Sequence, residues 1–592
     1  MTASARAAPA QKSNKSKDAE PSDQAGAHSG AGDELVLEYD LAALPSSQHR
    51  AGLVGLVLMC HWLNEQAQHA LRGTCSVEEC SARTLRLRLD RAGLASLLDQ
   101  VYGAAFEDRA YPRPFKNKEP DRIETRTEKN PKTQKEKEVT DYIYKVVVPD
   151  GSYRGDWGAE RDDPWLKLWR DMVWSILRGV PATRKPFELR ADNADLAAGG
   201  DGADKDDSGA AQNAIDDETD QLFAQLRRAD AVVDLPSTYY LGAQAKTAEN
   251  VRFRDQARQQ LLLHFWPLVV QIYIPVTLDI DGKRSYHGYA LAVPDVSDLQ
   301  RFCKRLPKAM RRRPAELAGY VPKGAVVTLA VESALDLFAQ LTTRLEDSEQ
   351  HAVRMDKLVY GVDIFHVKKD GNNIRMLGNE RIDVTWAAQT DRYLLLREWY
   401  QSTRFLQQRL INFFAERPWY AGFERIFAEV PWKQTIGSTW FCRDIRQAFD
   451  KEKQLTMSSD DSDTLAADAG EETAATATAP LDDNSIESLL YKLAGRYLAA
   501  RLKSKYDLEW ERAKADKAQK ELYEKHKKKL AKDAFLAIRA RTGDEFRAYF
   551  AGTLFSEPQR LKPDAYVTLA RALMDEPEKV RILTMLALSA RA

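Results

Sequence analysis

The sequence has little of what marks several common classes of protein. Its 592 residues include only five cysteines at irregular spacing, which argues against a disulfide-stapled secreted protein and fits a reducing compartment. No apolar run approaches the roughly 20 residues that a membrane helix needs. The first 33 residues are small and polar, unlike a signal peptide. We therefore expect a cytoplasmic protein with no membrane partner.

Signatures of catalysis are also missing. The sequence has no glycine-rich phosphate-binding loop, no GxGxxG after a strand and no HExxH. Its nine histidines are scattered, with no nucleophile or paired carboxylate beside them. Four residues could in principle ligate zinc, but their spacing is irregular and two would lie inside an apolar helix. These residues are Cys60, His61, Cys75 and Cys80. We expect no metal, no cofactor and no enzymatic activity.

The chain does have charge, and this charge is unevenly placed. The formal net charge is −1, yet residues 191–220 and residues 454–487 each contribute −9. Without these two segments, the rest of the chain carries +17 and is markedly basic. A basic folded part favours a polyanionic partner such as nucleic acid.

The hydrophobic pattern predicts an α+β protein of several domains, because 592 residues exceed what one core organises. Strands and hairpins with Asp-Gly turns alternate with helices in the first part, whereas the chain beyond residue 391 has helical periodicity. The predicted order is a disordered tail at 1–33, a mixed α/β domain at 34–190 with an exposed, mobile, charged insertion at 113–140, an unstructured acidic linker at 191–220, a central α+β domain at 221–390, a helical segment at 391–453, an acidic linker at 454–484 and a helical bundle at 485–592.

Two helices have features that bear on function. Residues 163–179 predict a helix with Asp163 as its cap and Pro164 in its first turn, and we expect its tryptophan-bearing face in the core. Residues 393–416 predict one long amphipathic helix. Around it, Arg404, Arg409 and Arg417 interleave with aromatic residues, a mixture that can stack bases. We interpret this segment as a buried helix instead.

The segment PSSQHR, residues 45–50, opens a long apolar helix. Either serine can cap this helix, and the residues that follow lie in its first turn. Free amides and the positive end of the helix dipole favour an anion there. Two interpretations stay open: a capped core helix, or a phosphate site. The phosphate site would consist of Ser46, Ser47, Gln48, His49 and Arg50.

Residues 301–313, RFCKRLPKAMRRR, hold seven basic residues and no acid. Helical spacing would place five of these along one side. Contact with about six phosphates would give log affinity a slope of roughly −5 against log salt. A solvated helix face is the alternative interpretation. The basic residues are Arg301, Lys304, Arg305, Lys308, Arg311, Arg312 and Arg313.

The C-terminal bundle carries a second basic patch. From residue 501 to residue 547 there are fifteen Lys or Arg against nine acids, and the run is densest at Lys527, Lys528 and Lys529. We predict that these lysines bind nucleic acid, although a polar helix surface would look similar. Several basic surfaces on separate parts of the chain indicate a long nucleic-acid track more than a single pocket.

Three stretches resemble a known family: LEYDLAALPSSQHRAGLVGLVLM near the start, and RARTGDEFRAYFAGTLFS and VRILTMLALSA near the end. They are similar to the large subunit of type I CRISPR effector complexes (Cascade), in particular its myxan-subtype branch. The resemblance implies a non-catalytic subunit that binds crRNA and target DNA, recognises the motif flanking the target, assembles with other Cascade subunits and helps to dock a helicase-nuclease. Ser46 to Arg50 would then contact a phosphate of the guide RNA or of the target DNA.

Two other functions stay open. A guide-processing endoribonuclease or a metal-dependent nuclease would need catalytic residues that the sequence does not display, and His49 with Arg50 comes nearest. A protein scaffold could instead use the basic patches to bind acidic protein surfaces. Strong, salt-dependent affinity for RNA or DNA would separate a nucleic-acid binder from such a scaffold.

Overall fold

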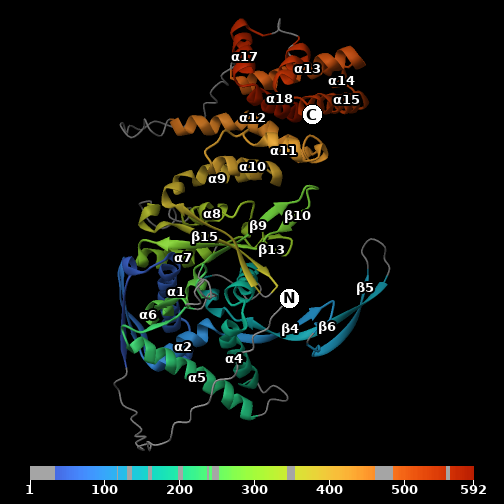
Figure 1. The fold of residues 1–592 in the computed structure, drawn as a ribbon. Helices are drawn as coiled ribbons and strands as arrows, with labels where there is room; N and C mark the ends of the chain where they lie inside the picture. Colours follow the sequence, from blue (N-terminus) through green and yellow to red (C-terminus); the bar gives the residue numbers. More distant parts are fainter. Residues whose placement is uncertain are drawn as a thin grey trace, which may run out of the picture.

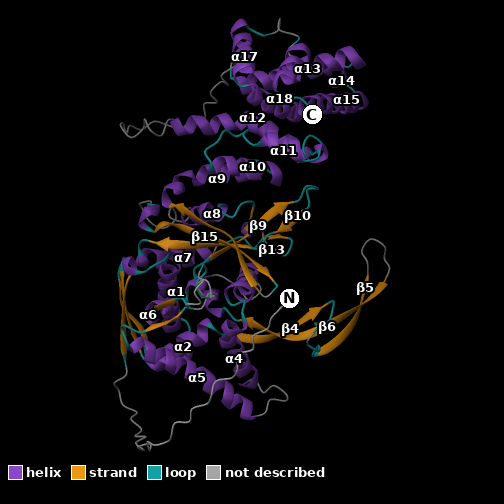
Figure 2. Ribbon diagram, viewed as in Figure 1, coloured by secondary structure: helices purple, strands orange, loops and turns teal. Residues whose placement is uncertain are grey.

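The fold is α+β, as predicted, and strands and helices occupy different parts of the molecule. The computed structural model describes residues 34–592 except 117, 130–135, 158–162, 198–204, 236–238, 243–251, 312, 343–353, 372, 461–484, 555 and 557–560. Among these described residues, strands end at Asp383 and only helices follow (Figure 2). The predicted tail and most of the second acidic linker lie outside the described residues. The division into domains stays a prediction.

A small antiparallel sheet and one long buried helix form the N-terminal part. The sheet has the order β1 (Leu35–Asp40), β3 (Thr84–Leu89) and β2 (Cys75–Cys80). Helix α1 (Ser47–Glu65) is buried along most of its length. Gly52 and Gly55 let this helix lie close to the backbone of residues 262–265. A Cβ at Gly52 would collide with the carbonyl oxygen of Leu262, and one at Gly55 with that of Phe265.

The charged insertion at 113–140 contributes to an arm built of strands. The arm is an antiparallel sheet in the order β4 (Ala104–Tyr111), β6 (Glu136–Pro149) and β5 (Arg122–Lys129). Figure 1 shows β5 and part of β6 reaching away from the body. Residues 122–127 are all exposed, as predicted. Because neither face of β5 is buried there, no apolar alternation reveals the strand in the sequence.

The tryptophan-rich helix follows its prediction closely. In α3 (Pro164–Met172), the Asp163 carboxylate accepts a hydrogen bond from the backbone N–H of Trp165 at 2.7 Å. The helix continues as a π-helical turn at Val173–Leu177. Trp169, Met172 and Ile176 are buried, which confirms the predicted core face.

The prediction of an unstructured acidic linker at 191–220 is wrong for most of its length. Helix α4 (Pro181–Ala197) enters this segment, and α5 (Lys205–Arg227) occupies its second half. Ile215, Thr219 and Leu226 are buried on α5 and give it a packing face. Two of its acids, Asp216 and Asp220, accept hydrogen bonds from Arg91 at the start of α2 (Arg91–Val101). Composition alone therefore overstated the cost of ordering this segment.

The central sheet has six strands. Its order is β10 (Arg284–Tyr286), β9 (Gln271–Leu278), β11 (Tyr289–Val296), β15 (Val359–Asp370) and β16 (Asn373–Asp383), and β14 (Val326–Val327) pairs in parallel with β9. Both predicted hairpins are present, and their turn glycines, Gly282 and Gly371, have φ of +82° and +60°. Helices α1 and α8 (Glu332–Thr342) pack against the sheet, below and above it in Figure 1.

Shorter elements connect these parts. Helix α7 (Leu299–Arg311) follows β11, and α6 (Ala257–Leu262) leads into a 3-10 turn at Trp266–Leu268. Two short antiparallel pairs are β7 (Val232–Asp234) with β8 (Arg254–Gln256), and β12 (Leu317–Ala318) with β13 (Val321–Pro322).

The long helix predicted at 393–416 is two helices. Helix α9 (Thr390–Trp399) ends before α10 (Thr403–Phe414) begins, with Ser402 as the α10 cap. The buried Asp444 carboxylate accepts hydrogen bonds from the backbone N–H groups of Gln401 and Ser402 at 2.9 and 2.6 Å. These bonds stabilise the non-helical backbone between α9 and α10. Helices α11 (Phe423–Glu429) and α12 (Thr439–Asp460) follow α10 along the chain.

The C-terminal part is helical, as predicted. Its helices are α13 (Ile486–Tyr506), α14 (Trp510–Ala513), α15 (Lys517–Arg539), α16 (Gly543–Tyr549), α17 (Pro563–Asp575) and α18 (Pro577–Arg591). Helix α18 contacts α12, α13, α15, α16 and α17, so it is the centre of this bundle (Figure 1). This position explains why α18 is apolar on nearly all sides and buried from Ile582 to Ala590.

Candidate nucleic-acid interface

The start of α1 has internal partners for its polar side chains. His49 is 3% exposed, and its two ring nitrogens lie 2.8 Å from Ser46 Oγ and 2.9 Å from Asp255 Oδ2. The Gln48 side chain donates to the Leu241 carbonyl and accepts from the Leu241 N–H, both at 2.9 Å. Ser47 is also buried. These contacts tie α1 to segments about 200 residues further along the chain.

The Arg50 side chain also has its partners within the protein. Its guanidinium pairs with Asp295 and donates to the carbonyl oxygens of Leu41 and Leu44 at 3.2 and 3.1 Å. Asp295 is buried and also accepts from Arg381 Nη2 at 2.8 Å. The geometry therefore favours the interpretation of a capped core helix. Phosphate contact at residues 46–50 stays a prediction.

Helix α7 places four of its predicted basic residues on an exposed side. Phe302, Leu306 and Met310 are buried against the core. The exposed residues are Arg301, Lys304, Lys308 and Arg311, at steps of three and four. We call these four residues the α7 basic row. Asp298, one turn before the row, lies 3.5 Å from Arg301.

Three other basic residues of this segment do not join the row. Arg305 is only 9% exposed. Arg313 lies 4.2 Å from the centroid of the Trp165 ring and donates two hydrogen bonds to Gln340 Oε1 at 3.1 Å. Arg312 lies outside the described residues. The predicted line was Arg301, Lys304, Arg305, Lys308 and Arg312. It is corrected in two respects, because Arg305 is buried and Arg311 is exposed beside the other three.

Lys527, Lys528 and Lys529 lie on α15. Lys528 and Lys529 are exposed. Lys527 is half-buried and lies 3.3 Å from Glu524, one turn earlier. Other lysines of the bundle also have acidic partners, such as Lys503 with Glu509 at 2.5 Å. Much of this patch is therefore balanced by its own acids.

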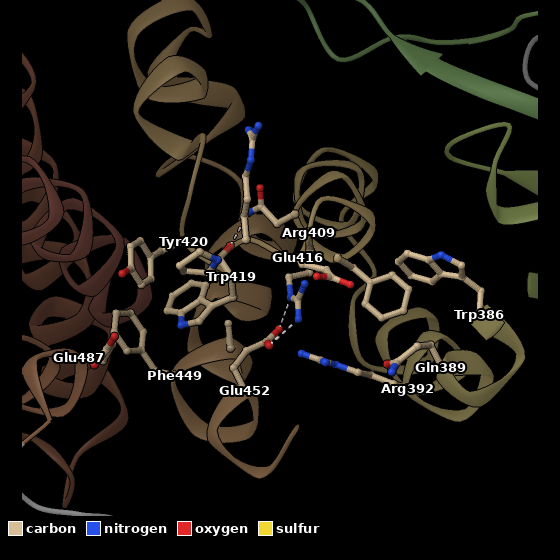
Figure 3. A pocket seen from close by; sticks show the side chains of 15 residues that line it. Trp386, Gln389, Arg392, Arg409, Glu416, Trp419, Tyr420, Phe449, Glu452 and Glu487 are labelled. Atoms are coloured by element: carbon tan, nitrogen blue, oxygen red, sulfur yellow. Dashed lines mark hydrogen bonds and ion pairs between the residues drawn. The ribbon is translucent and has the colours of Figure 1, made fainter. Parts of the chain in front are cut away.

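A cavity that the sequence did not reveal lies among the helices after the central sheet (Figure 3). Its volume is about 760 Å³. Its wall comes from the 3-10 turn at Val384–Gln389, helices α9, α10 and α12, residues 416–420 and the start of α13. Five aromatic residues line it: Trp386, Phe413, Trp419, Tyr420 and Phe449.

Three arginines share this cavity with three glutamates: Arg392, Arg409, Arg417, Glu416, Glu452 and Glu487. Arg409 is 2% exposed and donates to both carboxylate oxygens of Glu452, at 2.5 and 2.8 Å. Glu452 also accepts from the Tyr400 hydroxyl at 2.8 Å. The expectation that Arg409 lies on a buried helix is confirmed, but no local pattern links it to Glu452, 43 residues away.

The candidate zinc ligands do not form a metal site in the part of the chain that the structure describes. Cys60 and Cys75 are buried with their sulfur atoms 3.4 Å apart. His61 is half exposed and lies 3.6 Å from Glu65. Across the described residues, no group of three His, Cys, Asp or Glu side chains is arranged to hold a metal ion.

Two family models match consecutive parts of the chain. Residues 74–351 match the type I-B CRISPR Cas8b N-terminal domain, and residues 359–591 match the type I-B CRISPR Cas8b C-terminal domain. This chain belongs to the Cas8b family. The two matches together span most of its length and support a large subunit of a type I Cascade complex. No curated protein matches the chain. The narrower resemblance to the myxan-subtype branch has no support from these matches.

The two Cas8b parts meet inside the central sheet. Strands β9, β11 and β14 belong to the N-terminal match, whereas β15 and β16 belong to the C-terminal match. The α7 basic row lies in the N-terminal part of Cas8b, and the aromatic cavity lies in the C-terminal part. Among the described residues, no helix combines the length and the apolar character needed to cross a membrane.

Proposed function

We propose that this chain is the non-catalytic large subunit of a crRNA-guided type I-B interference complex. In this role it binds guide RNA and target DNA, contributes to recognition of the flanking motif and helps to recruit the helicase-nuclease during antiviral defence. Membership of the Cas8b family supports the place in the complex. Guide pairing supplies sequence reading in such systems, so a large subunit needs surfaces for backbone phosphates more than a catalytic constellation.

The observation that carries the binding role is the α7 basic row. Four exposed cations stand on one side of a helix whose other side is buried in the core. The rigid packing fixes their positions, so binding would not require ordering a loop. Four phosphate contacts would give log affinity a slope of about −3.6 against log salt on duplex DNA. This value is shallower than the slope of roughly −5 expected from six contacts.

The enzyme alternatives have weaker support. His49, the residue nearest to a catalytic candidate in the sequence, is buried and held by Ser46 and Asp255. A substrate phosphate would have to displace both partners to reach its ring. The scaffold alternative makes a different prediction, because acidic protein surfaces would compete with nucleic acid for the α7 basic row.

The test is to express the tagged chain with the other subunits of its complex and to sequence the RNA that copurifies. The proposal predicts short repeat-derived RNA, and duplex binding that depends on the flanking motif. Lys304→Glu with Lys308→Glu should weaken DNA binding at least tenfold without changing complex assembly. Lys323→Glu, an exposed lysine outside the row, is the matched control. A chain that copurifies without RNA, or equal DNA affinity in both variants, would contradict the proposal.

A further inference from the structure

The aromatic cavity holds two arginine N–H groups that have no acceptor among the described residues. One is Nη1 of Arg409, a side chain that is 2% exposed and lines the cavity. The other is Nε of Arg392. Figure 3 shows the Arg392 guanidinium pointing toward Arg409 and Glu452. A buried donor without an acceptor is costly, so this site favours a ligand that brings acceptor oxygens.

Two arginines, Arg392 and Arg409, interact electrostatically with one carboxylate, Glu452, in this cavity. Glu452 forms paired hydrogen bonds with Arg409. Burial lowers the pKa of Arg392 and repulsion from Arg409 lowers it further, whereas the charge of Glu452 opposes this shift. Glu416 and Arg417, by contrast, are exposed at the rim. An anionic oxygen between Arg392 and Arg409 would satisfy both unpaired donors and offset their repulsion.

The walls offer flat apolar surfaces on two sides of the arginines. Trp386 packs edge-on against Phe413, with ring centroids 5.6 Å apart, and Trp419 packs edge-on against Phe449 at 5.2 Å. In Figure 3, Trp386 and Trp419 stand on opposite sides of the Arg392 and Arg409 guanidinium groups. Aromatic rings beside cations are the usual means of holding a nucleobase next to its phosphate. A volume of about 760 Å³ is enough for one or two nucleotides.

We propose that this cavity binds a nucleotide, with its base stacked on the aromatic wall and its phosphate at the unpaired N–H groups of Arg392 and Arg409. The inference goes beyond the proposed function, since it concerns a pocket and not the backbone-tracking row on α7. The nucleotide has two sources with the same chemistry, a free mononucleotide or one unit of a single strand. Because three glutamates balance the three arginines, binding here depends on hydrogen bonds and stacking more than on net charge.

The test uses the full chain and isothermal titration calorimetry with four probes: AMP, adenosine, inorganic phosphate and a 5′-phosphorylated single-stranded trinucleotide. We expect AMP to bind at least tenfold more tightly than adenosine or phosphate, because of these three only AMP has both a base and a phosphate. Arg392→Gln and Trp386→Leu should each weaken AMP binding about tenfold. Arg425→Gln is the matched control, because Arg425 is exposed and pairs only with Glu429 among the residues described here. Tighter binding of the trinucleotide than of AMP assigns the strand as source, and equal binding assigns the free nucleotide.

Two results would overturn the inference: no binding of AMP or the trinucleotide, or binding that neither variant weakens. The outcome is independent of the proposed function. Arg392→Gln leaves the α7 basic row intact, so it should not change duplex binding. Lys304→Glu with Lys308→Glu leaves the cavity intact, so it should not change AMP binding.

Discussion

The start of α1 and helix α7 both carry clustered polar and basic residues, but these side chains point into the protein on α1 and towards solvent on α7. At the start of α1, Gln48, His49 and Arg50 turn inward and hold distant segments of the chain together. On α7, the basic row turns outward from a buried apolar face. The difference shows that a cationic cluster in the sequence identifies charge without identifying its partner, which is set by tertiary contacts.

The largest effect is expected from removing Asp295, the carboxylate that pairs with both Arg50 and Arg381. Asp295→Ala should lower the free energy of unfolding by about 3 kcal/mol, because two arginines lose a buried carboxylate. Urea unfolding followed by tryptophan fluorescence measures this change. Asp356→Ala removes a more exposed carboxylate that pairs with Arg354 and should cost less than about 1 kcal/mol. Equal effects of the two variants would contradict an internal role for Arg50.

Within residues 301–313, we expect Arg313 to contribute to stability and Arg311 to contribute to DNA binding. Arg313→Gln should lower the free energy of unfolding by about 1 kcal/mol, because the guanidinium no longer stacks on Trp165. Arg311→Gln, on the exposed row, should leave stability within about 0.5 kcal/mol but weaken DNA binding. Thermal unfolding and a DNA-binding titration, run on both variants, separate the two roles. Reduced DNA affinity in Arg313→Gln alone would contradict this assignment.

A third prediction concerns Asp444, a buried carboxylate that accepts hydrogen bonds from two backbone amides and lies 3.8 Å from Arg443. Burial raises the pKa of Asp444 from 3.8 to about 6, although the N–H groups of Ser402 and Gln401 and the charge of Arg443 oppose this rise. The folded state therefore holds this proton more tightly than the unfolded state. The resulting stabilisation is fully present below about pH 4 and is lost as the pH rises through about 6.

Asp444→Asn should accordingly flatten the dependence of stability on pH between about 4 and 6. Thermal unfolding midpoints measured across this range test the prediction. Asp391→Asn, at an exposed position in the first turn of α9, is the matched control and should keep the wild-type profile. An unchanged profile in Asp444→Asn would refute the proposed titration.

Periodicity and turn chemistry were sufficient to predict much of the fold. The α+β class, the hairpins around Gly282 and Gly371 and the core face of α3 all follow from local patterns. Helix α5 and strand β5 could not be predicted in this way. The acids of α5 hide a packing face that only the fold completes, and β5 is exposed on both faces.

The candidate sites show the same limit. Helical spacing alone predicted three residues of the α7 basic row, Arg301, Lys304 and Lys308, but it placed Arg305 on the exposed line, where the structure instead has Arg311. The roles of Arg50 and Arg409 were not predictable, since their carboxylate partners lie 245 and 43 residues away. The cavity around Arg409 combines residues from 386 to 487. No local motif of the sequence brings them together.

The most direct test of the central claim, that the α7 basic row meets nucleic acid, is the salt dependence of duplex affinity. We predict a slope of log affinity against log salt that becomes shallower by about 1.8 in Lys304→Gln with Lys308→Gln, since two phosphate contacts are lost. Arg50→Gln should keep the wild-type slope. The same slope in the double variant and in the wild type would contradict the account.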